Sequence, residues 1–228
     1  MPQTPSATTH KIDKQSLDSQ AAEVLKERIL GGELPAGARL KETVLAAETG
    51  LSRGTVRAAL HQLRFEGLVE QVPYAGWSVA SLTVRDAWEL LSLRAALEGL
   101  AARLAAEAPA ERRETLRDAL AVLVEACEGG DPEEIVSADL ALHAKIVELA
   151  EHERLANHYS IVRQQSRVYV RSSNRLLPTP EAVLEQHRPL VEAVCNGEAE
   201  LAERLARSHN EVEGRALVEH LREGDKTR

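Results

Sequence analysis

Three histidines and one aspartate are spaced so that they could hold a metal ion. Asp139 and His143 are four residues apart, which places them on one face of a helix. His187 and His209 lie on either side of Asn196-Gly197, and an antiparallel helix pair joined there would bring both rings to roughly the same level. Imidazole and carboxylate groups from three helices suit a divalent transition metal.

Four protein ligands would leave two positions of an octahedral ion open for water or for a bidentate carboxylate. A single histidine is more often an ordinary core or surface group, and this alternative stays open for each member of the set. The remaining histidines are interpreted in that ordinary way: His10, His61, His152, His158 and His220.

A second chemical group lies at the start of an expected helix that ends at Gly67. Ser52 can cap this helix by accepting from a free backbone N–H. Arg53, Thr55 and Arg57 follow on its polar side. The apolar stripe on the other side consists of Val56, Ala59, Leu60 and Leu63.

A short helix over 41–49, closed by Gly50, precedes this segment and completes the pattern of a helix-turn-helix. The major groove of B-DNA admits one helix, whose N-terminal residues touch the base edges. The sequence therefore predicts DNA reading by Arg53, Thr55 and Arg57. The alternative is that these side chains form only a solvated face.

The elements around the second helix predict a winged domain over residues 16–82. A first helix is expected over 17–30, and strands over 68–72 and 77–80 would form a small β-hairpin wing. The wing tip at Ala75-Gly76 is either a contact to phosphate or minor groove or an ordinary turn. Residues 1–15 have the composition of a flexible arm.

From Thr83 onward, long helical periods replace the turn residues. Strong start signals occur at Thr83, Asp131-Pro132 and Thr179-Pro180. The sequence predicts an antiparallel bundle over residues 83–222, followed by a tail at 223–228. The fold class is therefore mainly α. The six expected helices cover about 84–106, 110–128, 131–150, 154–177, 179–196 and 198–221.

The charge is divided unevenly along the chain. Residues 1–82 hold 9 Lys+Arg and 9 Asp+Glu, whereas residues 83–228 hold 19 and 27, which accounts for the net charge of −8. The total charge does not favour DNA binding, so the local pattern must carry that prediction. The sequence has neither a membrane-span pattern nor a secretory-signal pattern. We expect a cytoplasmic protein whose Cys127 and Cys195 are buried thiols.

The segment Leu51-Ser52-Arg53-Gly54-Thr55-Val56-Arg57-Ala58-Ala59-Leu60, with Glu66-Gly67-Leu68-Val69 after it, resembles the N-terminal domain of GntR-family transcription regulators. The motifs Arg94-x-x-Leu97-Glu98, Asp139-x-x-x-His143, Glu185-x-His187 and His209 resemble the metal-binding branch of their FCD-type effector domains. The resemblance implies a homodimeric regulator, expected to be a repressor, that binds a double-stranded DNA operator and a small organic acid.

By this resemblance, each predicted site residue matches a family position. Ser52, Arg53, Thr55, Arg57 and Gly76 match DNA contacts. Asp139, His143, His187 and His209 match ligands of a metal, with zinc preferred over nickel, manganese or iron. Arg94 matches an arginine that faces the effector cavity, although a surface arginine on an amphipathic helix is the alternative.

The sequence departs from the family pattern at four places, which are Thr43, Thr55, Ala58 and the wing tip Ala75-Gly76. These departures concern which operator is bound. Two other functions remain open at this point. One is a metallohydrolase that carries a helix-turn-helix, since such a site could activate water. The other is a regulator whose metal is purely structural.

Overall fold

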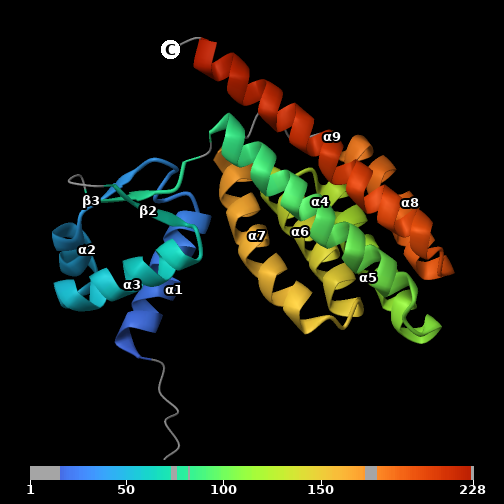
Figure 1. The fold of residues 1–228 in the computed structure, drawn as a ribbon, viewed down its shortest axis with the longest axis horizontal. Helices are drawn as coiled ribbons and strands as arrows, with labels where there is room; N and C mark the ends of the chain where they lie inside the picture. The colour runs from blue at the N-terminus through green and yellow to red at the C-terminus, as the bar shows by residue number, and fades with distance from the viewer. Residues whose placement is uncertain (1–15, 73–75, 82, 173–178, 227–228) are drawn as a thin grey trace, which may run out of the picture.

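The computed structural model describes residues 16–72, 76–81, 83–172 and 179–226. The chain forms an N-terminal part of three helices and a small sheet, which lies beside a bundle of long helices (Figure 1). Among the helices that the structure describes, none combines the length and the apolar character that crossing a membrane requires.

The N-terminal part contains the predicted winged helix-turn-helix. Its sheet has the antiparallel order β1-β3-β2, in which Val69 pairs with Val79 and Arg39 pairs with Ser78. Strand β1 is absent from the sequence-based prediction, because two residues show no periodicity. The elements are α1 (Leu17–Leu30), β1 (Arg39–Leu40), α2 (Glu42–Thr49), α3 (Arg53–Phe65), β2 (Val69–Val72) and β3 (Gly76–Val79).

Capping and burial position helix α3. Ser52 Oγ accepts a hydrogen bond from the Thr55 amide at 3.1 Å and so begins the helix. The stripe residues Val56, Ala59, Leu60 and Leu63 are fully buried against α1 and the sheet. This packing turns the opposite, polar side of the helix toward solvent.

The bundle contains the six predicted helices, of which α4 packs most extensively against α9. A capping box formed by Thr83 and Asp86 begins α4, and proline occupies the first turn of α6 and of α8. The helices are α4 (Val84–Ala106), α5 (Ala110–Gly129), α6 (Pro132–Leu149), α7 (Glu153–Ser172), α8 (Pro180–Asn196) and α9 (Ala199–Lys226).

Some expected details were wrong. Helix α9 continues to Lys226 rather than ending near Leu221. Val24 and Leu100 lie at helical spacing among buried apolar residues but expose 47% and 40% of their surface, because the apolar periodicity is wider than the face that each helix buries. The expected end of α7 near Leu177 lies outside the described residues, as does Ala75 of the wing tip.

The two parts of the chain share an interface. Leu90 of α4 and Val162 of α7 belong to the hydrophobic core of the N-terminal part. Gln165 of α7 donates a hydrogen bond from Nε2 to the carbonyl oxygen of Glu66 at 3.2 Å, just beyond α3. Gly67 has a φ of +73°, and a Cβ atom there would collide with the Gln165 side chain. The C-terminal end of α3 is therefore packed closely against α7.

Candidate metal centre and nucleic-acid interface

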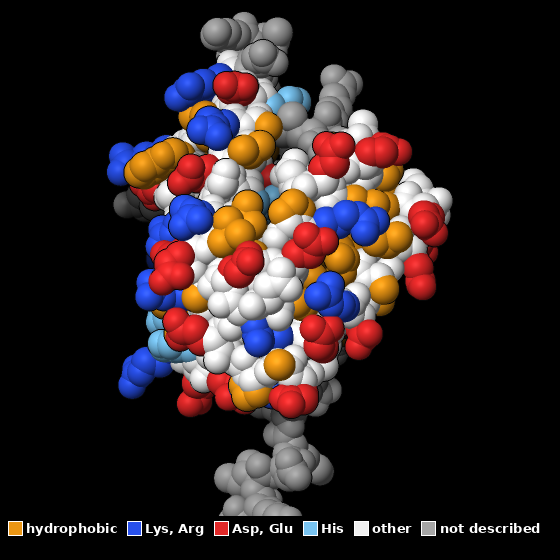
Figure 2. Space-filling model, turned by 90° about the vertical axis from the view of Figure 1, so that its right-hand side faces the viewer, with side chains coloured by type: hydrophobic (Ala, Val, Ile, Leu, Met, Phe, Trp, Pro, Cys, Tyr) orange, Lys and Arg blue, Asp and Glu red, His pale blue; other side chains and the backbone are white. Residues whose placement is uncertain are grey.

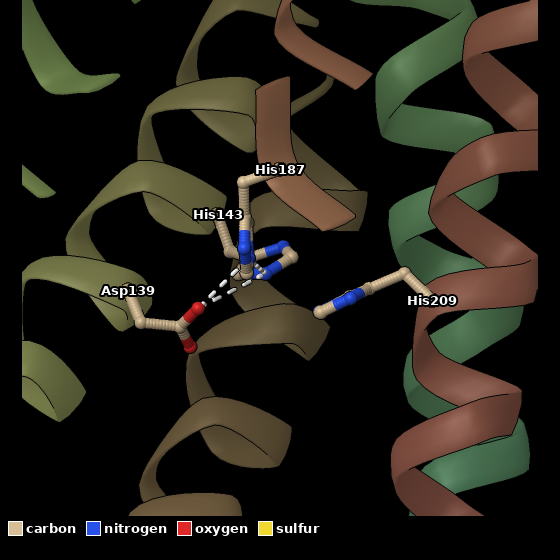
Figure 3. Close-up of side chains that lie close together, drawn as sticks. All are labelled: Asp139, His143, His187 and His209. Carbon is tan, nitrogen blue, oxygen red and sulfur yellow. Dashed lines mark hydrogen bonds and ion pairs between the residues drawn. The ribbon is translucent and has the colours of Figure 1, made fainter. Parts of the chain in front are cut away.

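The four predicted metal ligands converge inside the bundle. Asp139 and His143 come from α6, His187 from α8 and His209 from α9 (Figure 3). One donor atom from each residue lies within 4.8 Å of all the others. Asp139 Oδ1 is 2.8 Å from His187 Nε2, which in turn is 3.0 Å from His143 Nε2. The antiparallel α8–α9 pair thus brings the two late histidines together, with ring centroids 4.5 Å apart.

The second nitrogen of each imidazole ring faces an oxygen atom. Nδ1 of His187 is 2.7 Å from the Val183 carbonyl oxygen, and Nδ1 of His209 is 2.9 Å from Gln186 Oε1. Nδ1 of His143 is 2.8 Å from Glu98 Oε2, a close charge contact without the alignment of a hydrogen bond. These oxygen atoms favour the proton of each neutral ring on Nδ1, which leaves Nε2 as an acceptor or metal ligand.

The free Nε2 atoms that result are oriented in a way that suits a bound cation. With Nδ1 protonated on both rings, the Nε2 lone pairs of His143 and His187 face each other at 3.0 Å. Two such lone pairs repel unless a proton or a cation lies close to both. Nε2 of His209 is buried without a hydrogen-bond partner among the described residues. The donor set and its orientation therefore fit a transition metal such as zinc.

Burial and neighbouring charges shift the pKa values in the cluster. Burial lowers the pKa of His209 to about 4. Burial acts against ionisation of Asp139 as well, but the hydrogen bond to His187 and the charges of both rings hold the pKa of Asp139 below its usual value. Burial opposes protonation of His187, but the hydrogen bond to Asp139 raises the pKa of His187. A metal ion that binds here must therefore displace the proton on Nε2 of His187, whereas His209 is already neutral.

Arg94 is buried beside this cluster, with 2% of its surface exposed. The alternative of a surface arginine is therefore wrong. Its Nε donates to Glu98 Oε1 at 2.7 Å, and Nη1 donates to Glu213 Oε2 at 3.1 Å. Its Nη2 atom is buried and has no hydrogen-bond partner within the described parts of the chain.

Several residues around the site were not predicted from the sequence. Glu98 links Arg94 to His143, and its Oε2 also accepts from Asn210 Nδ2 at 2.7 Å. Glu213 lies 3.5 Å from His209 Nε2. Their spacing offered a signal, since Glu98 follows Arg94 and Glu213 follows His209 by four residues, which is one helical turn.

The predicted DNA-reading residues lie together at the exposed start of α3. The Arg53 and Arg57 side chains expose 63% and 54% of their surface. Ser52 is exposed and Thr55 is half-buried, and their hydroxyl groups hydrogen-bond at 2.9 Å. Gly76, with a φ of +90°, begins β3, and no atom of the described residues lies within 4 Å of where its Cβ would be.

Glu42, at the start of α2, was not predicted from the sequence and holds Arg57 in place. Arg57 donates from Nε and Nη2 to the two carboxylate oxygens of Glu42 at 2.8 and 2.7 Å. Trp77 of the wing donates to the same carboxylate at 3.2 Å. The hydrogen bond from Arg57 is the main reason that the pKa of Glu42 falls to about 2. The Glu42 carboxylate therefore stays charged and holds the Arg57 guanidinium near the N-terminal end of α3.

Comparison with known proteins agrees with this two-part architecture. Residues 17–79 match the gntR family of bacterial regulatory proteins, and residues 89–212 match the FCD domain. The chain belongs to the GntR family. It is 32% identical over 203 residues to a probable D-xylose utilization operon transcriptional repressor of Paenarthrobacter nicotinovorans, with 89% of each chain covered. It is 29% identical to the HTH-type regulator YdhC of Bacillus subtilis, over 88% of this chain and 90% of YdhC.

Solved structures share the fold. McbR/YncC of E. coli superposes with a TM-score of 0.74 at 23% identity, covering 91% of this chain and 99% of McbR. A putative GntR regulator of Rhodococcus sp. RHA1 also gives 0.74, at 24% identity, covering 89% of this chain and 98% of the Rhodococcus chain. The chain is thus a GntR-family transcriptional regulator. Its families and relatives are regulators rather than enzymes, which removes the metallohydrolase hypothesis.

Proposed function

We propose that this GntR-family regulator is a homodimeric repressor. Its affinity for the operator would be set by a small carboxylate bound beside a metal ion in the bundle. The observation that supports the proposal most strongly is the arrangement of Asp139, His143, His187 and His209. Their donor atoms lie within 4.8 Å of one another. An oxygen faces the second nitrogen of every imidazole.

These four residues would hold the ion, with zinc as the preferred metal because its usual ligands are imidazole and carboxylate. When bound, the ion would supply positive charge and open coordination positions for a carboxylate. Arg94 would supply the second contact of the effector, since its buried Nη2 has a donor to spare. A carboxylate held between a cation and a guanidinium gains charge-assisted hydrogen bonds in a site shielded from water.

The start of α3 would read the operator. Arg53, Thr55 and Arg57 are exposed or half-exposed on the side of the helix away from the core, where they would reach base edges in the major groove. Ser52, at the start of α3, and Gly76, in the wing, would contact the phosphate backbone of the DNA. In a homodimer the two N-terminal parts would bind DNA about 34–36 Å apart, which is one helical turn of the duplex.

The interface between the two parts offers a route from effector to DNA. Burial and the charge of Glu98 raise the pKa of Tyr159 on α7, against the opposing charge of Arg94, so Tyr159 lies close to this buried pair. Two turns further along α7, Gln165 holds the end of the recognition helix through Glu66. We propose that this interface has two arrangements, which differ in how the N-terminal part is oriented on the bundle. An effector that binds one arrangement more tightly than the other would shift the protein toward that arrangement.

The proposal is tested by DNA binding with and without the ligand. An operator is first selected from random duplexes with zinc-loaded protein. Acids released on denaturing the purified protein are identified by mass spectrometry and added back to the stripped, zinc-loaded protein. We expect the acid to change the operator Kd by at least about fivefold, the lower end of typical coupling.

His187→Ala should lose this response, whereas exposed His158→Ala should keep it. An unchanged Kd in the wild type with the bound acid would contradict effector control and favour a purely structural metal. Chelation would then unfold the bundle without any ligand-dependent change in DNA affinity.

A further inference from the structure

Glu213 spans the two groups that the effector is proposed to join. It lies on α9 one turn after His209, on the same face of the helix. Its Oε2 accepts a hydrogen bond from Arg94 Nη1 at 3.1 Å, and its Oε1 is 3.5 Å from His209 Nε2. A carboxylate of the protein itself thus reaches both Arg94 and the histidine cluster.

The hydrogen-bond donors of Arg94 explain why this position matters. Its Nε is committed to Glu98 on the same helix. A guanidinium holds a carboxylate best through two parallel N–H groups, and the pair that remains is Nη1 with Nη2. Nη2 has no partner among the described residues, whereas Nη1 is occupied by Glu213. A second N–H of Nη1 remains, but an incoming carboxylate that used both nitrogens would lie beside the charged Glu213 carboxylate, and the two would compete for the guanidinium.

The two acidic partners of Arg94 differ in how easily they can leave. Glu98 has a 2% exposed side chain and is also held by Asn210. The Glu213 side chain is 30% exposed, so it can turn toward water and keep its charge solvated. Moving a buried, fully paired carboxylate would cost far more than moving one at the protein–water boundary.

We propose that Glu213 is an internal carboxylate that fills the effector's position in the ligand-free protein and is displaced by the effector. The inference rests on the proposed function, because it assumes a metal in the cluster. It specifies the ligand as one that carries an ionised carboxylate able to compete with Glu213. It also predicts weak apparent binding, since only the fraction of molecules with Glu213 swung out can take the ligand.

The test compares Glu213→Gln and Glu213→Ala with the wild type in the full-length chain. The control is Glu211→Gln, which removes the same charge from an exposed position two residues away on α9. Zinc content is measured first, by elemental analysis after dialysis. Acetate affinity is then measured by calorimetry on the zinc-loaded proteins, with neutral acetamide as the ligand control. Both Glu213 variants should bind acetate about tenfold more tightly if Glu213 is in place about 90% of the time.

Each outcome bears on one statement. Glu211→Gln should bind acetate as the wild type does. Equal or weaker acetate binding by zinc-loaded Glu213→Gln and Glu213→Ala would overturn the internal-carboxylate role. Loss of zinc from these variants alone would also overturn it, because Glu213 would then be a metal ligand. Failure of the wild type to hold zinc would overturn the proposed function itself, and this inference with it.

Discussion

The recognition helix and the bundle cluster use the same residue chemistry in opposite settings. At the start of α3, the side chains of Arg57 and its partner Glu42 are 54% and 16% exposed. In the bundle, Arg94 and Glu98 form a pair with the same chemistry but almost no exposure. An exposed pair can exchange its partner for a nucleic acid at small cost, whereas a buried pair is held by everything around it. The first suits reading a large ligand, and the second suits enclosing a small one.

The surface charge follows the same division. Acidic side chains are spread over the bundle face turned away from the N-terminal part, with basic and hydrophobic groups between them (Figure 2). The surplus of acidic residues lies after residue 82, so the net negative charge of the chain belongs to the bundle. We expect the electrostatic attraction to DNA to come from the N-terminal part alone.

Salt should separate the two regions most strongly. Operator affinity should fall by about 10³-fold or more between 50 and 200 mM salt if the heads contact at least six phosphates. Acetate binding by the zinc-loaded bundle should change far less, because buried charges are weakly screened. DNA titrations and calorimetry over one salt series measure both. A flat salt response of the DNA affinity would count against DNA contact by the α3 face.

Removing a buried charge should have the next largest effect. Arg94→Met leaves Glu98 buried without its guanidinium partner, which should lower the free energy of unfolding by about 3–5 kcal/mol. Arg85→Met, in an exposed pair with Glu89 on the same helix, should change it by less than about 1 kcal/mol. Denaturant unfolding of the zinc-loaded proteins gives both values. Similar losses in the two variants would contradict the contrast between buried and exposed pairs.

A base-reading arginine should affect operator affinity more than stability. Arg57→Ala should cost about 1–3 kcal/mol on the selected operator and much less on random DNA. Arg64→Ala, at the far end of the same helix, serves as the control and should have a smaller effect. Equal losses for Arg57→Ala on operator and random DNA would instead identify a phosphate contact.

Helix caps give the smallest and most closely matched effects. Ser52→Ala and Thr179→Ala each remove one cap hydrogen bond, to the Thr55 and Ala182 amides, and each should cost about 1 kcal/mol of stability. Only Ser52→Ala should also weaken DNA binding, since α8 lies in the bundle. Thr179→Ala reducing operator affinity as much as Ser52→Ala would erase the distinction between the two regions.

The sequence predicted the two regions unequally. The chemistry of α3 is contiguous, so Ser52, Arg53 and Arg57 could be placed from their positions relative to one cap and one apolar stripe. The cluster of Asp139 and three histidines was also predicted, because helical spacing and one antiparallel turn suffice to bring these residues together. The two carboxylate partners of Arg94, Glu98 and Glu213, were not predicted from the sequence. Glu213 is 119 residues away in the chain, and its contact depends on how α9 is rotated against α4.

Glu42 shows the same limit within the N-terminal part. It is 15 residues from Arg57, and periodicity places it on the first turn of α2 without indicating which helix face meets α3. Strand β1 was missed for a related reason, since its two residues form a strand only because β3 pairs with them. Local signals therefore predicted the elements, whereas the contacts between elements required the structure.

The metal content of the purified protein tests the central claim most directly. After dialysis, elemental analysis should find about one zinc or similar ion per wild-type chain. His187→Ala and His209→Ala should each lose it, and exposed His158→Ala should retain it. Because the imidazoles must be neutral to act as ligands, the affinity for the ion should also fall as the pH is lowered and the rings take up protons. Full retention of the ion by both buried-histidine variants would contradict the account.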